Sequence, residues 1–155
     1  MVSTAARVPR NTSTQVNLQI RKATEERIEY YSQHIGEIEA RLTELDREWD
    51  IERTIEANAS TIAFAGIILG ATVNIRWLIL PFAVTGFLFQ HAIQGWCPPV
   101  PVLRKMGFRT ADEINKERSA LKALRGDFKR MASGKNKVRS IIKSVGLSKG
   151  TSKKG

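Results

Sequence analysis

The sequence predicts an all-α membrane protein, in which a two-helix transmembrane hairpin carries an N-terminal coiled-coil helix and a C-terminal amphipathic helix. Three observations lead to this fold class. Residues 57–93 contain a single charged side chain, Arg76. Residues 16–56 repeat apolar side chains with heptad spacing. Residues 110–131 begin with a helix-capping motif and continue with one apolar face.

The net charge of +10 is distributed unevenly along the 155 residues. Residues 1–56 hold 8 basic and 11 acidic side chains, whereas residues 94–155 hold 16 basic and 4 acidic ones. An acidic helical part, an apolar part and a basic part therefore follow one another. A single cysteine and two histidines at unrelated positions exclude a disulfide scaffold and a cysteine-rich metal site. We expect no metal and no cofactor.

The first fifteen residues are rich in Ser, Thr and Arg and contain Pro9. They show neither apolar periodicity nor a hydrophobic run. Residues 1–15 are therefore predicted to be disordered, and they do not have the composition of a signal peptide.

Residues 16–56 are predicted to form one long amphipathic helix that self-associates through a heptad seam. The seam residues are Ile28, Tyr31, Ile35, Ile38, Leu42, Leu45 and Trp49. Apolar side chains at a and d positions, flanked by charges, predict a coiled coil between copies of the chain and hence a homo-oligomer, a dimer or higher. The alternative is a long helix that packs back on its own chain, because three heptads are near the lower limit for an independent coiled coil.

The apolar stretch divides into two halves, 57–75 and 77–96, of 19 and 20 residues. Helices of this length reach about 28–30 Å at roughly 1.5 Å per residue, the hydrocarbon thickness of a bilayer. The short break at Arg76 predicts a tight turn at the far interface, and Trp77 and Trp96 bracket the second half as an aromatic belt would. The alternative is a buried helical pair in a soluble bundle.

Small residues in the first half predict close helix packing. Gly66 and Gly70 form a GxxxG pair, which lets another helix approach the backbone. The partner is either the second half of the same chain, through Ala83 and Gly86, or the first half of a neighbouring copy. Pro81 predicts either a kink in the second half or a helix that begins close to it.

A proline-rich, basic segment at 97–109 follows the hairpin, and it is predicted to turn the chain along the membrane surface as an interfacial helical turn. Thr110 and Glu113 then form a capping box that begins an amphipathic helix over 110–131. The tail, 132–155, is rich in basic residues, Ser and Gly and is predicted to be disordered.

Cations around and within the tail are predicted to bind anionic surfaces. They are Lys129, Arg130, Lys135, Lys137, Arg139 and Lys143. Anionic lipid headgroups attract clustered cations of this kind, so membrane lipid is the expected partner. Nucleic acid is not expected as a partner, because the tail has no aromatic side chains for base stacking.

The basic residues nearest the hairpin predict its orientation. Five cations flank its two open ends, against Arg76 alone at the turn: Arg47, Arg53, Arg104, Lys105 and Arg109. The positive-inside rule then places both termini in the cytoplasm.

Residues from about 51 to 109 resemble the YgaP-like inner-membrane domain family. The resemblance consists of a Gly-rich apolar helix entered at Asn58, a short break, a second apolar helix, the Gly-aromatic-Cys-Pro motif at 95–98 and the Val-Leu-Arg-Lys-Met-Gly-Phe stretch at 102–108. It covers about 60 of the 155 residues. The resemblance implies a bacterial inner-membrane helical hairpin that is often dimeric. Some members carry a rhodanese sulfurtransferase domain, for which this chain has neither a second cysteine nor the length.

Cys97 is the one candidate for a reactive or modified thiol. Arg104 and Lys105 lie nearby in the sequence and would lower the pKa of its thiol, whereas the alternative is a small residue that ends a helix before proline. No histidine lies within one helical turn of Cys97, so the sequence predicts no enzyme.

The predicted function is a non-enzymatic inner-membrane scaffold or anchor. It would self-associate and recruit a cytoplasmic protein partner or anionic lipid on the cytoplasmic side. The alternative is an oligomeric channel or carrier for a small anion, either a sulfur-containing anion or another one.

Overall fold

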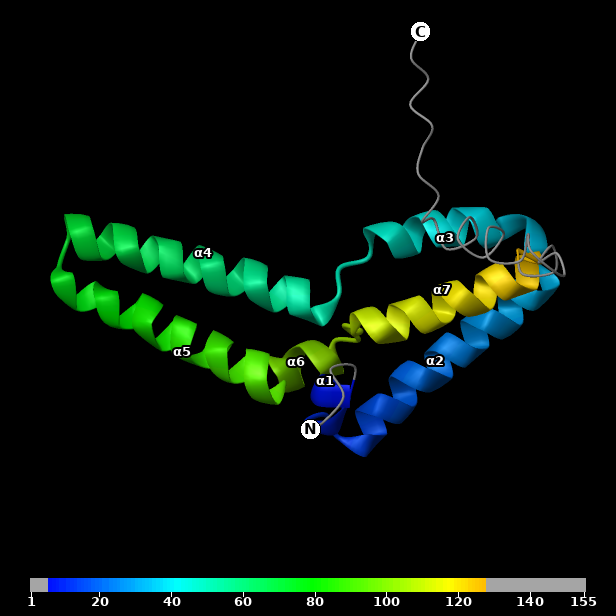
Figure 1. Cartoon of the computed structure of the whole chain (residues 1–155), viewed down its shortest axis with the longest axis horizontal. Coiled ribbons are helices and arrows are strands. Elements are labelled where there is room, and N and C mark those ends of the chain that lie inside the picture. The colour runs from blue at the N-terminus through cyan, green and yellow to red at the C-terminus, as the bar shows by residue number, and fades with distance from the viewer. Residues whose placement is uncertain (1–5, 128–155) are drawn as a thin grey trace, which may run out of the picture.

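A computed structural model describes residues 6–127, and within that range every regular element is helical (Figure 1). The all-α prediction is therefore confirmed. The helices and 3-10 turns, in chain order, are α1 (Arg7–Arg10), α2 (Thr14–Gln33), η2 (Ile35–Glu37), α3 (Ile38–Arg47), α4 (Ile51–Thr72), η3 (Ile75–Leu78), α5 (Ile79–Gln94), α6 (Val100–Lys105) and α7 (Ala111–Arg125).

These elements divide into two halves that lie at opposite ends of an elongated molecule (Figure 1). At one end α4 and α5 lie side by side, joined through η3, and we call them the apolar pair. At the other end α7 lies between α2 and α3, and we call these three helices the head. The short helices α1 and α6 lie at the junction between the two halves.

The head has its own apolar core. Ile38, Leu42 and Leu45 of α3 are buried against Ile114 and Leu121 of α7. The predicted capping box begins α7, because the Thr110 hydroxyl accepts from the Glu113 amide (3.3 Å) and the Glu113 carboxylate accepts from the Thr110 amide (2.9 Å). Four orphan amides at the start of a helix need such acceptors, so the motif fixes where α7 starts.

The single helix predicted over 16–56 is corrected by the structure, which breaks this stretch at two places. α2 ends at Gln33, where His34 leaves helical geometry, and Gly36 lies in the 3-10 turn that follows. Glu48 is extended, and the Asp50 carboxylate then accepts from the Arg53 amide at 2.7 Å to cap α4. A capping aspartate starts a new helix, so the heptad spacing continues across residues that do not form one rod.

The seam residues consequently do not form one continuous face. Ile38, Leu42 and Leu45 are used inside the head, whereas Ile35 is 54% exposed and Trp49 is also exposed. The described residues thus match the alternative in which this part of the chain packs on the rest of itself. Self-association is not tested by this arrangement.

The start of the chain also differs from the prediction that 1–15 is disordered. Within the described residues, α1 is helical, and Val8 is only 3% exposed. Val8 lies in a second core with Ile51, Ile55, Cys97 and Val100. A single apolar residue cannot show a helical period, so the sequence pattern did not predict that Val8 packs in this core.

The apolar pair turns where the sequence predicted a break. α4 ends at Thr72, and the Asn74 side chain accepts from the Arg76 amide at 2.9 Å to begin η3. Pro81 lies in the first turn of α5, where a missing amide hydrogen costs no helical hydrogen bond. Of the two possibilities at Pro81, the late helix start is the one observed.

The segment after α5 is only partly as predicted. α5 ends at Gln94 with Gly95 as its cap, and α6 begins among the prolines, with Pro99 before it and Pro101 in its first turn. Arg104 is fully buried rather than directed to a surface. α7 ends at Arg125, and the tail cations from Lys129 onward lie outside the described residues, as do 1–5 and the predicted tail 132–155.

Candidate functional site

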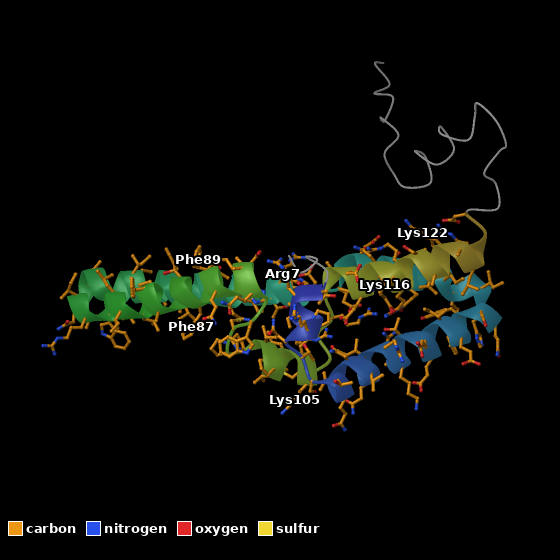
Figure 2. All side chains as sticks on the ribbon, turned by 60° about the horizontal axis from the view of Figure 1, so that its bottom comes forward. Arg7, Phe87, Phe89, Lys105, Lys116 and Lys122 are labelled. Atoms are coloured by element: carbon orange, nitrogen blue, oxygen red, sulfur yellow. The ribbon has the colours of Figure 1, made fainter. Side chains whose placement is uncertain are left out.

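The apolar pair exposes large apolar side chains on most of its surface. Phe82 is 80% exposed, and Phe87 and Phe89 lie on opposite sides of α5 (Figure 2). Both helices are long and apolar enough to cross a membrane. Monomeric soluble proteins rarely expose contiguous apolar patches of more than a few hundred Å². Among the described residues nothing covers this surface, so the pair is not buried within the chain itself.

Gly66 faces α5 and Gly70 faces η3 of the same chain. A Cβ atom added to Gly66 would lie 2.6 Å from Cδ of Pro81, and one added to Gly70 would lie 2.5 Å from Cδ2 of Leu78. The GxxxG pair thus lets α4 and α5 approach within the chain. Gly86, which was predicted to pack against these glycines, does not do so, since a Cβ atom on it would meet nothing within 4 Å.

Hydroxyl groups within the apolar pair bond to their own helices. The Thr61 hydroxyl donates to the Ala57 carbonyl at 2.7 Å, the Thr72 hydroxyl to the Ile68 carbonyl at 2.7 Å, and the Thr85 hydroxyl to the Pro81 carbonyl at 2.8 Å. Hydroxyls satisfied in this way can lie in hydrocarbon without an unpaired hydrogen.

The N-terminal helix is fixed to the end of the apolar pair. The Arg7 guanidinium donates to the Ala92 carbonyl, and the Asn11 amide donates to the Gln94 carbonyl at 2.8 Å. Gly95 ends α5 with a φ of 72°, and a Cβ atom there would lie 2.7 Å from the Arg7 carbonyl carbon. Only glycine fits this position, because both the backbone angle and the contact with α1 exclude a side chain.

Arg104 connects the junction to the head. Its guanidinium donates to both oxygens of Glu113 (2.6 and 2.8 Å), to the Asn17 side chain (2.9 Å) and to the Phe108 carbonyl (3.0 Å). These four bonds join α6 to α2 and to α7. A buried guanidinium with this many acceptors holds the three elements in one orientation.

A second ionic cluster is centred on Glu117 of α7, whose side chain is 0% exposed. Glu117 accepts from Arg27 of α2 at 3.1 Å and from Arg41 of α3 at 2.9 Å, and it also accepts from Arg109. Arg109 in turn donates to both oxygens of Glu48 (2.8 and 2.5 Å). One carboxylate therefore joins all three helices of the head to the segment before α7.

These contacts set the charge state of the Glu117 and Glu113 carboxylates. Burial alone would raise the pKa of Glu117, but hydrogen bonds from Arg41 and Arg109 and the charges of Arg109 and Arg27 outweigh it, so its pKa lies below the ordinary 4.5. Burial would also raise the pKa of Glu113, but hydrogen bonds from Arg104 and Thr110 and the charge of Arg104 outweigh it, so this pKa is lowered as well. Both carboxylates are charged at neutral pH.

A cavity of about 350 Å³ opens between α2, α3 and α6, and we call it the basic cavity. Apolar and small residues of α2, together with Gly107, form part of its wall. Its charged lining residues are Arg27, Arg41, Glu48, Arg104, Lys105 and Arg109. Sequence patterning missed this cavity, because these cations are far apart in the chain and no local motif joins them.

Cys97 does not have the surroundings of a reactive thiol. It is 2% exposed and lies in the core with Val8 and Val100. Burial raises the pKa of the Cys97 thiol above its ordinary 9.0, while a hydrogen bond from Val100 opposes this. The neighbouring Arg104 is engaged with Glu113, so the predicted lowering of the thiol pKa does not occur.

Comparisons with protein-family models, with curated proteins and with solved structures find no match to this chain. The resemblance to YgaP-like domains consequently stays a prediction from the residues at 51–109.

Proposed function

We propose that the chain is a non-enzymatic membrane scaffold, in which α4 and α5 form a transmembrane hairpin that holds the head at the cytoplasmic face of a bacterial inner membrane. One observation supports this most: the exposed large apolar side chains gather on the apolar pair, whereas the head buries an apolar core of its own. A bilayer supplies the missing apolar contact.

The connection between the halves supports a scaffold. Arg104 and Asn11 bond across the junction, and the Ile51 amide at the start of α4 donates to the Arg109 carbonyl at 2.9 Å. A head joined by several such contacts keeps one orientation relative to the hairpin. A scaffold needs this property, because its binding surface must face the cytoplasm at a fixed height above the bilayer.

Three further parts of the proposal rest on the sequence. The cytoplasmic position follows from the flanking cations, the bacterial inner membrane from the resemblance at 51–109, and recruitment of a cytoplasmic protein or anionic lipid from the exposed charge. We still propose homo-oligomerisation, but through a surface other than the heptad seam, because Leu42 of that seam is buried within the head. The hydroxyls of the apolar pair bond to their own helices, so they do not favour the channel alternative.

Alkaline carbonate extraction tests the anchor. Wild-type protein should stay in the membrane pellet. Phe87→Asp combined with Phe89→Asp should move protein to the supernatant, because each aspartate at the centre of a membrane helix costs about 2.5–3.5 kcal/mol. Leu18→Asp is the matched control, since Leu18 is an exposed apolar residue of the head. Complete release of wild-type protein would overturn the proposal.

A further inference from the structure

We propose that the basic cavity binds a phosphate group, carried either by a lipid headgroup or by a soluble phosphate compound. Five cations line this open cavity, and its volume of about 350 Å³ is near the small end of ligand pockets, which span roughly 300–1,000 Å³. A ligand the size of a phosphate with a short substituent fits this volume.

The cavity keeps positive charge after its internal ion pairs are counted. Three carboxylates, those of Glu48, Glu113 and Glu117, contact its five cations, which leaves a surplus of two positive charges. Glu44 contacts Arg41 from the solvent side and reduces the surplus to one. The surplus attracts an anion into the cavity, where the negative charge of the anion balances it.

Two donors at the cavity have no acceptor among residues 6–127. The Nε atom of Arg104 is buried and has no hydrogen-bond partner, although the other nitrogens of this guanidinium are all engaged. Lys105, beside it, is exposed and forms no ion pair with the described residues. A buried, unpaired N–H costs free energy, and Arg104 lines the cavity. A ligand oxygen that accepts from Nε after a shift of this side chain would remove that cost.

The donor set favours phosphate over a single carboxylate. A guanidinium N–H and an ammonium group beside further arginines suit an anion whose oxygens point in several directions. Phosphate presents such oxygens and carries enough charge to oppose Glu48, which also lines the cavity. Ion pairs hold the guanidinium groups of Arg104 and Arg109 before the ligand arrives, whereas Lys105 forms no such pair among the described residues.

The position of the cavity suggests a lipid headgroup as one source of the phosphate. α6 follows the end of α5 after the short proline-rich turn, and Lys105 ends α6 beside the start of α2 (Figure 2). If the apolar pair spans the bilayer, the cavity lies close to the headgroups. Only the lipid source rests on the proposed membrane anchor. The phosphate site itself does not.

The test compares Lys105→Glu with Lys122→Glu in the full-length protein. Lys122 lies at the other end of the head, on α7, and does not line the cavity (Figure 2). In detergent, inorganic phosphate is titrated against chloride at equal ionic strength, with melting temperature as the readout. In lipid nanodiscs, phosphatidylcholine alone is compared with phosphatidylcholine containing phosphatidic acid. Binding to the folded state alone raises the melting temperature.

We expect wild-type protein to be stabilised by inorganic phosphate, by phosphatidic acid, or by both. Lys105→Glu should weaken the response about tenfold in ligand concentration, whereas Lys122→Glu should leave it unchanged. A response to phosphatidic acid alone assigns the lipid source, and a response to inorganic phosphate assigns the soluble one. No response in either arm, or equal loss in the two variants, would overturn the proposal. Failure of the membrane anchor would instead appear as release by carbonate, with the inorganic phosphate response intact.

Discussion

Arg104 and Glu113 form a two-point ion pair, with nitrogen–oxygen distances of 2.6 and 2.8 Å, that joins α6 to the first turn of α7. The same Glu113 carboxylate caps α7 by accepting from the Thr110 amide. One side chain thus both starts the helix and fixes it to the junction. The orientation of the head relative to the apolar pair depends on this carboxylate.

Arg104→Lys should lower the free energy of unfolding by about 1.5–3 kcal/mol, because an ammonium group cannot replace the planar fork that reaches Glu113 and Asn17 together. Thermal unfolding in detergent measures the loss. Lys105→Arg is the matched control, since Lys105 is exposed and its charge is retained. Equal melting temperatures for Arg104→Lys and wild type would show that this pair does not orient the head.

Acid should destabilise the head through Glu117 and Glu113. Their pKa values are lower in the folded protein than the ordinary 4.5, so their stabilising contribution is complete above about pH 4.5 and is lost as the pH falls through the folded values. The melting temperature should therefore be nearly constant at neutral pH and decline in acid. A melting temperature that stays constant down to about pH 3 would contradict this linkage.

Glu117→Gln separates the contribution of Glu117 from general acid effects. The variant should already be less stable at neutral pH by about 3–5 kcal/mol, because its arginines lose a buried counter-charge. It should then lose less stability on acidification than wild type. Glu44→Gln is the control, since Glu44 is exposed and pairs with the same Arg41 from outside the buried cluster.

Alanine substitutions at the three glycines of the apolar pair should lower the stability of the protein by different amounts. Gly66→Ala should cost about 1–3 kcal/mol, since its methyl group meets the rigid ring of Pro81. Gly70→Ala should cost less, because the nearest atom is the flexible end of Leu78. Gly86→Ala should be neutral, since nothing lies within 4 Å of an added Cβ atom. Thermal unfolding that ranks Gly86→Ala with Gly66→Ala would contradict the packing of α4 on α5.

Gly95→Ala should release α1 from the junction. Its methyl group would meet the backbone of Arg7, and the φ of 72° adds strain for any L side chain. Gly107→Ala is the control, because Gly107 has a φ of 91° and no atom within 4 Å of an added Cβ atom. This variant therefore has the backbone strain without the steric contact. Limited trypsin digestion should cleave after Arg7 or Arg10 faster in Gly95→Ala. Equal rates in the two variants would show that α1 is not held by this contact.

Local signals predicted much of the fold. The Thr110–Glu113 box fixes the start of α7, the uncharged residues on either side of Arg76 mark the two apolar helices, and Pro81 marks the late start of α5. Each of these features depends on residues close in sequence, where spacing and propensity decide the outcome.

Features that depend on distant residues were missed. The cap at Asp50 was missed although it is local, because the heptad spacing on both sides of it suggested one continuous helix. Val8 gave no pattern, since a single apolar side chain has no period. The basic cavity joins α2, α3 and α6, and only tertiary packing brings Arg27, Arg41 and Arg104 together.

The central claim is that α4 and α5 cross the membrane and leave the head in the cytoplasm. Single cysteines in a Cys97→Ala background test it, placed by Val73→Cys at the turn, Phe87→Cys within α5 and Lys122→Cys on the head. A membrane-impermeant maleimide is added to spheroplasts of the expressing bacteria before and after permeabilisation. We predict that Val73→Cys reacts from outside, that Lys122→Cys reacts only after permeabilisation, and that Phe87→Cys reacts only after denaturation. Labelling of Val73→Cys and Lys122→Cys from the same side, or of Phe87→Cys in the native protein, would contradict the account.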